Sequence, residues 1–97
     1  MNEQVAAEIA EEYLSRWRRV AVHDELALME ENDDKDWVNV TGKDGSSYKI
    51  LFYVLPEADR ALRLVVAVND RVPRPNVAPV TRTAVMRPDG TYTAVRP

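Results

Sequence analysis

Two strand-like segments in the middle of the chain, residues 47–55 and 61–69, are apolar on both of their faces. The side chains of a strand point alternately to the two sides of a sheet. One side of this hairpin carries Tyr48, Ile50, Phe52, Val54, Leu62, Leu64, Val66 and Val68. The other side still carries Leu51, Tyr53, Leu55 and Val65. An antiparallel sheet with one face in water alternates apolar and polar residues, so the sequence predicts that both faces of this hairpin need cover.

The amino-terminal segment, residues 3–20, supplies cover for one face. Its apolar residues recur with the 3.6-residue period of an amphipathic helix. They form a stripe of Val5, Ile9, Tyr13, Trp17 and Val20, widened by Ala6, Ala10 and Leu14. Asn2 is suited to cap the first turn. A helix of this length is roughly 27 Å long and about 10 Å wide, so it can cover only one of the two faces.

Shorter segments with turn signals between them predict the rest of the sheet. The pair Asp44-Gly45 supplies the positive φ that a tight hairpin requires, and Pro88-Asp89-Gly90 is typical of a turn. The further strands that we expect are residues 25–31, 37–41, 80–87 and 91–95. Residues 70–79 contain three prolines, which cannot donate to a sheet ladder, so we expect a loop there.

These elements predict an α+β, two-layer domain in which one amino-terminal helix packs on a curved antiparallel sheet of four to six strands. The sheet is expected to lie within residues 25–95. This layout resembles the helix-wrapped sheet of cystatin-like folds. The chain has 97 residues and no linker-like segment, so we expect a single domain over residues 1–97.

The composition of the chain excludes several classes of protein. Cysteine is absent, which removes disulfides, thiolate nucleophiles and zinc–thiolate sites. No apolar run approaches the roughly 20 residues of a membrane helix, and the first residues lack a signal-peptide pattern, so we expect a cytoplasmic protein. Residues 1–45 contain 5 basic and 12 acidic residues, whereas residues 46–97 contain 8 and 4. The acidic first part repels phosphate and the later arginines are scattered, which argues against nucleic-acid binding.

The segment of residues 30–36 concentrates five carboxylates before a tryptophan. An EF-hand loop that starts at Asn32 needs a glycine at its sixth position and a glutamate at its twelfth. Trp37 and Lys43 stand at these positions instead. We interpret the segment as a solvated turn that discourages edge-to-edge pairing of strands. The alternative is a weak cation site, or a surface for a basic partner, built from Glu31, Asp33, Asp34 and Asp36.

The sequence contains no pattern typical of a catalytic or cofactor site. His23 is the only histidine, so one chain cannot build a multi-histidine metal site. The glycines stand singly at turns, which excludes a glycine-rich phosphate loop, and no serine occupies a nucleophile elbow. We therefore expect a protein that is not an enzyme and that uses no cofactor.

Three hypotheses follow from the second apolar face of the hairpin. In the first, the protein is a small interaction module that binds itself or another protein through an interface of Leu51, Tyr53, Leu55 and Val65. Four such exposed side chains would form a patch of the size that marks interaction sites. In the second, a small apolar ligand binds in a pocket between helix and sheet, lined by Trp37, Tyr48, Phe52 and Tyr53. In the third, the loop of residues 70–79 covers the face, and the domain has no separate site.

Overall fold

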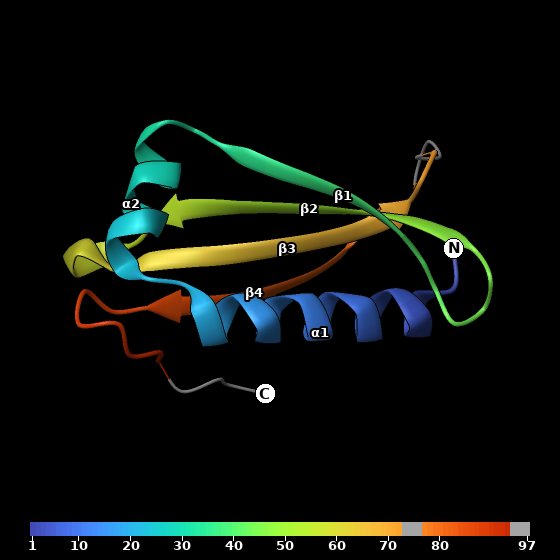
Figure 1. Ribbon diagram of the computed structural model, residues 1–97, viewed down its shortest axis with the longest axis horizontal. Coiled ribbons are helices and arrows are strands. Elements are labelled where there is room, and N and C mark those ends of the chain that lie inside the picture. Colours follow the sequence, from blue (N-terminus) through green and yellow to red (C-terminus); the bar gives the residue numbers. More distant parts are fainter. Residues whose placement is uncertain (73–76, 94–97) are drawn as a thin grey trace.

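The computed structural model describes residues 1–72 and 77–93, which form two helices and a four-stranded antiparallel sheet (Figure 1). The elements are α1 (Glu3–Val20), α2 (His23–Glu31), β1 (Lys35–Thr41), β2 (Ser47–Pro56), β3 (Leu62–Asp70) and β4 (Val80–Met86). A short 3₁₀ turn, Ala58–Arg60, connects β2 to β3. Strands that follow one another in the chain are neighbours throughout the sheet. The predicted two-layer α+β class is therefore confirmed.

α1 has the bounds that the sequence predicts. Its first turn is capped by Asn2, whose Oδ1 accepts a hydrogen bond from the backbone N–H of Val5 at 3.1 Å. The most deeply buried side chains of the helix are Val5, Ala6, Ala10 and Leu14. The centre of the contact thus falls on alanines, whose small side chains let the helix lie close to the sheet. The predicted stripe was wrong at Val20, which is 70% exposed, because the helix ends there and the chain turns into α2.

The second helix corrects a prediction, because residues 25–31 were expected to form a strand. Leucine, alanine, methionine and glutamate all favour a helix, and Asp24 and Glu25 in the first turn suit the positive end of its dipole. Leu26 is the buried residue of α2 and belongs to the core. The helix packs chiefly on β2. The domain therefore has two helices on its sheet instead of one.

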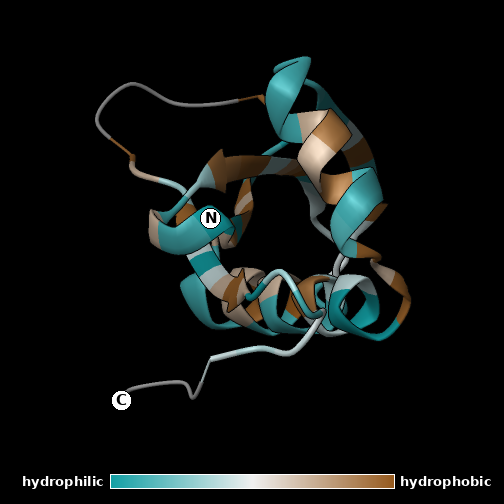
Figure 2. Cartoon of the chain, turned by 90° about the vertical axis from the view of Figure 1, so that its left-hand side faces the viewer, coloured by the Kyte–Doolittle hydropathy of each residue, from teal (hydrophilic) through white to brown (hydrophobic). Residues whose placement is uncertain are grey.

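The two helices and the sheet enclose one hydrophobic core, and an end-on view shows how the helices and the strands are arranged around it (Figure 2). Phe52 and Tyr48 are its largest completely buried side chains. The ring of Trp17 stacks on that of Phe52, with 3.9 Å between the centroids and 6° between the planes. This contact joins the last turns of α1 to the middle of β2.

The hairpin turns lie where the sequence places them. Gly45 and Gly90 have φ angles of 81° and 88°, a region that only glycine adopts without strain. The segment expected as a strand over residues 91–95 contributes only an isolated bridge between Tyr92 and Met86 in the described part of the chain, and residues 94–95 lie outside that part. Residues 73–76 of the expected loop also lie outside the described residues.

Candidate functional site

The two helices bury their apolar residues against the same side of the sheet. Strand pairing places the alternate residues on the opposite side, where Leu51 of β2 lies between Trp37 of β1 and Ala67 of β3. One step along the strands, Tyr53 lies between Lys35 and Val65. We call this side the helix-free face; its apolar side chains include Trp37, Leu51, Tyr53, Leu55, Val65 and Ala67. Because it is the face that neither helix covers, it is the candidate functional surface.

The structure brings the four residues of the predicted interface onto this face but exposes them unequally. Leu55 is 42% exposed, and Leu51 and Tyr53 are half-buried. Val65 is only 3% exposed, since it lies on an interior strand between Tyr53 and Thr83. Leu55, Leu51 and Tyr53 are therefore accessible to a partner, whereas Val65 is buried beside Tyr53 and is not accessible.

Trp37 is the residue of this face that the predicted interface left out. It is 56% exposed although it is the largest side chain of β1. A hollow of about 170 Å³ lies beside it, lined by Trp37, Lys49, Leu51, Ala67, Asn69 and Pro79. The sequence contained the information needed to place Trp37 on this face. If the hairpin turn pairs Thr41 with Ser47, then four residues further along each antiparallel strand Trp37 pairs with Leu51.

The charged side chains of the helix-free face are basic. Within the described strands, the positions on this face carry Lys35, Lys49 and Arg63 and no carboxylate. Lys35 forms an ion pair at 3.2 Å with Asp33. The Nζ atom of Lys49 lies 4.1 Å from the centroid of the Trp37 ring, a cation–π distance. Lys49 is thus the basic group that borders the hollow.

Arg63 at the far end of the face is paired with Glu57 at 3.0 Å. The hydrogen bond that the guanidinium donates to this carboxylate lowers the pKa of Glu57 and raises the pKa of Arg63. Both side chains are partly exposed, and water screens a pair of this kind strongly. This ion pair neutralises the charge of Arg63 at the edge of the face.

The four aromatic residues expected to line one pocket divide between the two sides of the sheet. Tyr48 and Phe52 are fully buried in the core beneath the helices, whereas Trp37 and Tyr53 lie on the helix-free face. The structure therefore does not bring these four residues around one pocket. A shallow groove of about 250 Å³ does lie between α1 and β1, and the aromatic ring in its lining is that of Tyr13.

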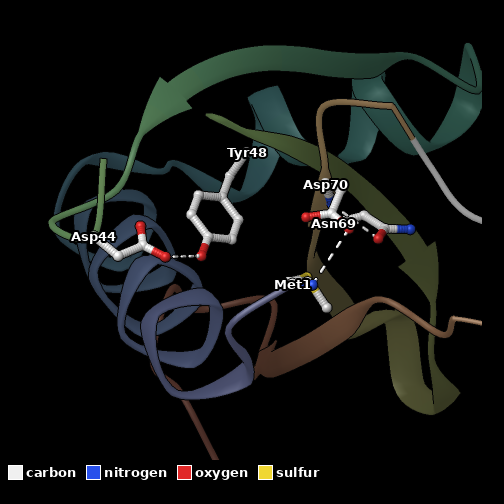
Figure 3. A network of polar contacts seen from close by, with 5 residues as sticks. All are labelled: Met1, Asp44, Tyr48, Asn69 and Asp70. Atoms are coloured by element: carbon white, nitrogen blue, oxygen red, sulfur yellow. Dashed lines mark hydrogen bonds and ion pairs between the residues drawn. The ribbon is translucent and has the colours of Figure 1, made fainter. Parts of the chain in front are cut away.

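The hydroxyl group of the buried Tyr48 side chain forms a hydrogen bond at the end of the sheet (Figure 3). Its O–H donates to the Asp44 carboxylate at 2.8 Å. Burial, together with this carboxylate, raises the pKa of Tyr48, and the hydroxyl lowers the pKa of Asp44. Nearby, the amino group of Met1 lies 3.6 Å from the Asp70 carboxylate. These contacts fix the turn before β2 and the start of α1 against the sheet, which is a structural role.

The acidic segment follows the last turn of α2 and lies on the surface. Glu31, Asp33, Asp34 and Asp36 are all exposed. Asp33 adopts a φ of 52°, which aspartate tolerates better than most residues, and pairs with Lys35. In residues 1–72 and 77–93, no three acidic or histidine side chains come close enough together to hold a metal ion.

His23 stands in the first turn of α2. Its Nε2 lies 3.0 Å from the backbone oxygen of Arg60, so it connects α2 to the turn between β2 and β3.

Among the described residues, no helix has both the length and the apolar character to cross a membrane. Comparison with protein-family models, with curated proteins and with solved structures gives no match for this chain.

Proposed function

We propose that this protein is a non-enzymatic interaction module that binds another protein through the helix-free face, with Trp37 at the centre of the contact. The observation that carries the proposal is the exposure of 56% of a tryptophan beside an apolar hollow. Tryptophan is enriched among the few residues that supply most of the binding energy of protein interfaces. The adjacent Leu51, Tyr53 and Leu55 extend the apolar surface along β2.

The size of the hollow favours a protein over a small ligand. Pockets for cofactors and drug-sized molecules enclose roughly 300–1,000 Å³, whereas this hollow has about 170 Å³. A cavity of about 150 Å³ is filled by a molecule of the size of benzene. The hollow therefore accommodates one apolar side chain, and the rest of the binding surface has to come from the face around it.

The charge of the face favours a different protein over a second copy of the chain. Lys35 and Arg63 are paired with Asp33 and Glu57, but two copies that meet face to face about a twofold axis would bring two Lys49 side chains together, and the strands offer no carboxylate on this face to oppose them. Like charges that face each other across an interface disfavour the complex. A cytoplasmic setting stays the expectation from the cysteine-free sequence.

Selection from a displayed library of random peptides tests this function. The wild-type protein should enrich peptides that Trp37→Ala does not retain, because the variant loses the wall of the hollow. Leu28→Ala is the matched control, since Leu28 is equally exposed on α2 and lies outside the helix-free face. The proposal would be refuted if the selected peptides bound wild type and Trp37→Ala equally, or if the selection yielded no binding peptide.

Light scattering coupled to chromatography tests the choice between a partner and a second copy. We expect a monomer for the wild type and for Tyr53→Lys over the whole concentration range. A wild-type dimer that Tyr53→Lys dissociates would show that a second copy occupies the face. That result would overturn the proposed partner while keeping the assignment of the surface.

A further inference from the structure

We infer that the partner segment carries a carboxylate next to the apolar side chain that enters the hollow, and that Lys49 is the counter-charge for this carboxylate. The inference rests on the proposed function, because it names the chemistry of the partner that binds the same face. Its basis is the juxtaposition of Lys49, Trp37 and Asn69 around an otherwise apolar hollow.

The first step of the argument is the distribution of charge. Of the three basic residues on the helix-free face, Lys35 and Arg63 are paired with Asp33 and Glu57 from the flanking turns. Lys49 lies on β2 in the interior of the face, and within the described residues its contact is the Trp37 ring. A partner that covers the hollow therefore removes water from a positive charge, which favours a partner that brings a negative one.

The second step concerns what the ammonium group of Lys49 can still donate. It carries three N–H donors and no acceptor, and a cation over an aromatic ring uses the ring face without taking up all of its donors. A carboxylate at the rim can accept from the ammonium while the ammonium stays over Trp37. The cation–π contact thus holds the charge of Lys49 at the rim before a partner arrives.

The third step adds a second donor, the side-chain amide of Asn69, next to Lys49. The backbone N–H of Asp70 donates to Oδ1 of Asn69 at 2.8 Å, so the NH₂ end of this side-chain amide is the end that can donate to a ligand. Asn69 and Lys49 are direct cross-strand partners. Two donors from neighbouring strands therefore border the same rim, a combination that fits the two oxygens of a carboxylate.

The experiment compares two blocked peptides by NMR, acetyl-Gly-Phe-Asp-Gly-amide and its asparagine counterpart, which differ only in the carboxylate. The indole N–H of Trp37 reports binding to the hollow, and that of Trp17, stacked in the core on the other side of the sheet, serves as the internal control. We expect the aspartate peptide to bind about threefold to fivefold more tightly at low salt, the upper part of the range of an exposed ion pair. In about 1 M sodium chloride, where the Debye length is about 3 Å, the two affinities should become equal.

Matched variants assign this preference to Lys49. Lys49→Met should bind both peptides equally, and Lys49→Arg should keep the preference for aspartate. Lys43→Met removes the same charge at a lysine that pairs with Glu8 of α1 and should behave as wild type. Lys49→Met remains folded in our expectation because the residue is partly exposed, and the unchanged Trp17 signal verifies this.

The possible results separate the inference from the function on which it rests. If the wild type binds both peptides equally at low salt and the Trp37 signal shifts, the inference that the partner carries a carboxylate is refuted. The proposal that the apolar hollow is a protein-binding site then still stands. A Trp37 signal that neither peptide moves would overturn both. A preference for aspartate that survives in Lys49→Met would assign the carboxylate to another group and refute the role of Lys49.

Discussion

Replacement of Gly42 by alanine is expected to destabilise the protein far more than the addition of one methyl group suggests. A Cβ atom at this position would lie 2.7 Å from Cε1 of Tyr48, 2.8 Å from Oδ1 of Asp44 and 2.9 Å from Cγ1 of Val5. Non-bonded carbon atoms are optimally about 3.5–4.0 Å apart, so at least one neighbour has to move. The three neighbours come from β2, the turn and α1, so the movement of one of them leaves the close contacts with the other two in place.

The cost of this change follows from what each neighbour holds. Tyr48 is fully buried and Val5 is 4% exposed, so neither finds free space, and overpacking of a core costs about 1–3 kcal/mol. A shift of Tyr48 or Asp44 also weakens their hydrogen bond, which contributes about 0.5–1.5 kcal/mol. The lower backbone entropy of alanine in the unfolded chain offsets about 0.4–1 kcal/mol. The balance is a loss of about 2 kcal/mol in the free energy of unfolding.

Urea denaturation followed by tryptophan fluorescence measures this loss. Gly45→Ala, in the same turn, is the control, because a Cβ there meets open space and the cost comes only from its φ of 81°. That strain is worth about 1–2 kcal/mol, and Gly45→Asn should recover part of it since asparagine tolerates this φ. Gly42→Asn should recover nothing. A Gly42→Ala protein within about 0.5 kcal/mol of wild type, the usual range for surface changes, would refute the steric argument.

Two further predictions concern titration and the acidic turn. Because hydrogen bonding lowers the pKa of Asp44 below 3.8 in the fold and burial raises that of Tyr48 above 10.0, stability should fall both below about pH 4 and above about pH 10. In urea midpoints measured against pH, Tyr48→Phe should reduce both falls, and what remains should come from the lowered pKa values of Glu57 and Asp89 and the raised pKa of Tyr92; an unchanged alkaline fall in Tyr48→Phe would contradict this. For the acidic turn we expect no change in Trp37 fluorescence at millimolar calcium, and a saturable change would restore the cation site.

The elements that the sequence predicts well are those whose signals are local. β2 was expected over residues 47–55 and occupies Ser47–Pro56, because its alternation and the flanking glycine turn lie within a few residues of one another. The cap at Asn2 and the bounds of α1 are local in the same sense. These predictions needed no knowledge of the partner of each strand.

α2 could not be predicted in the same way, because it buries little. In this helix of nine residues, Leu26 alone is fully buried, and one buried residue produces no period in the sequence. Its first residues receive no side-chain cap either, since Val22 stands at that position. The helix forms where Leu26 can reach the core between β2 and β3, a condition set by the tertiary structure.

The candidate site shows the same division between local and tertiary information. Alternation along one strand correctly assigned Leu51, Tyr53 and Leu55 to the face opposite the core. It could not show that Val65 is covered, because cover on an interior strand comes from side chains on both neighbouring strands. Nor could it show how exposed Trp37 would be.

The exposure of Trp37 follows from the order of the strands. β1 stands at the edge of the sheet and has a neighbouring strand on one side only, so the Trp37 ring gains cover from Lys49 and Leu51 of β2, and no described strand lies beyond the edge to cover it from the other side. An interior position would cover the same ring from both sides, as it covers Val65. The meander that follows two helices thus leaves the largest side chain of β1 where a second protein can reach it, and strand order rather than any residue motif makes this face a binding surface in our proposal.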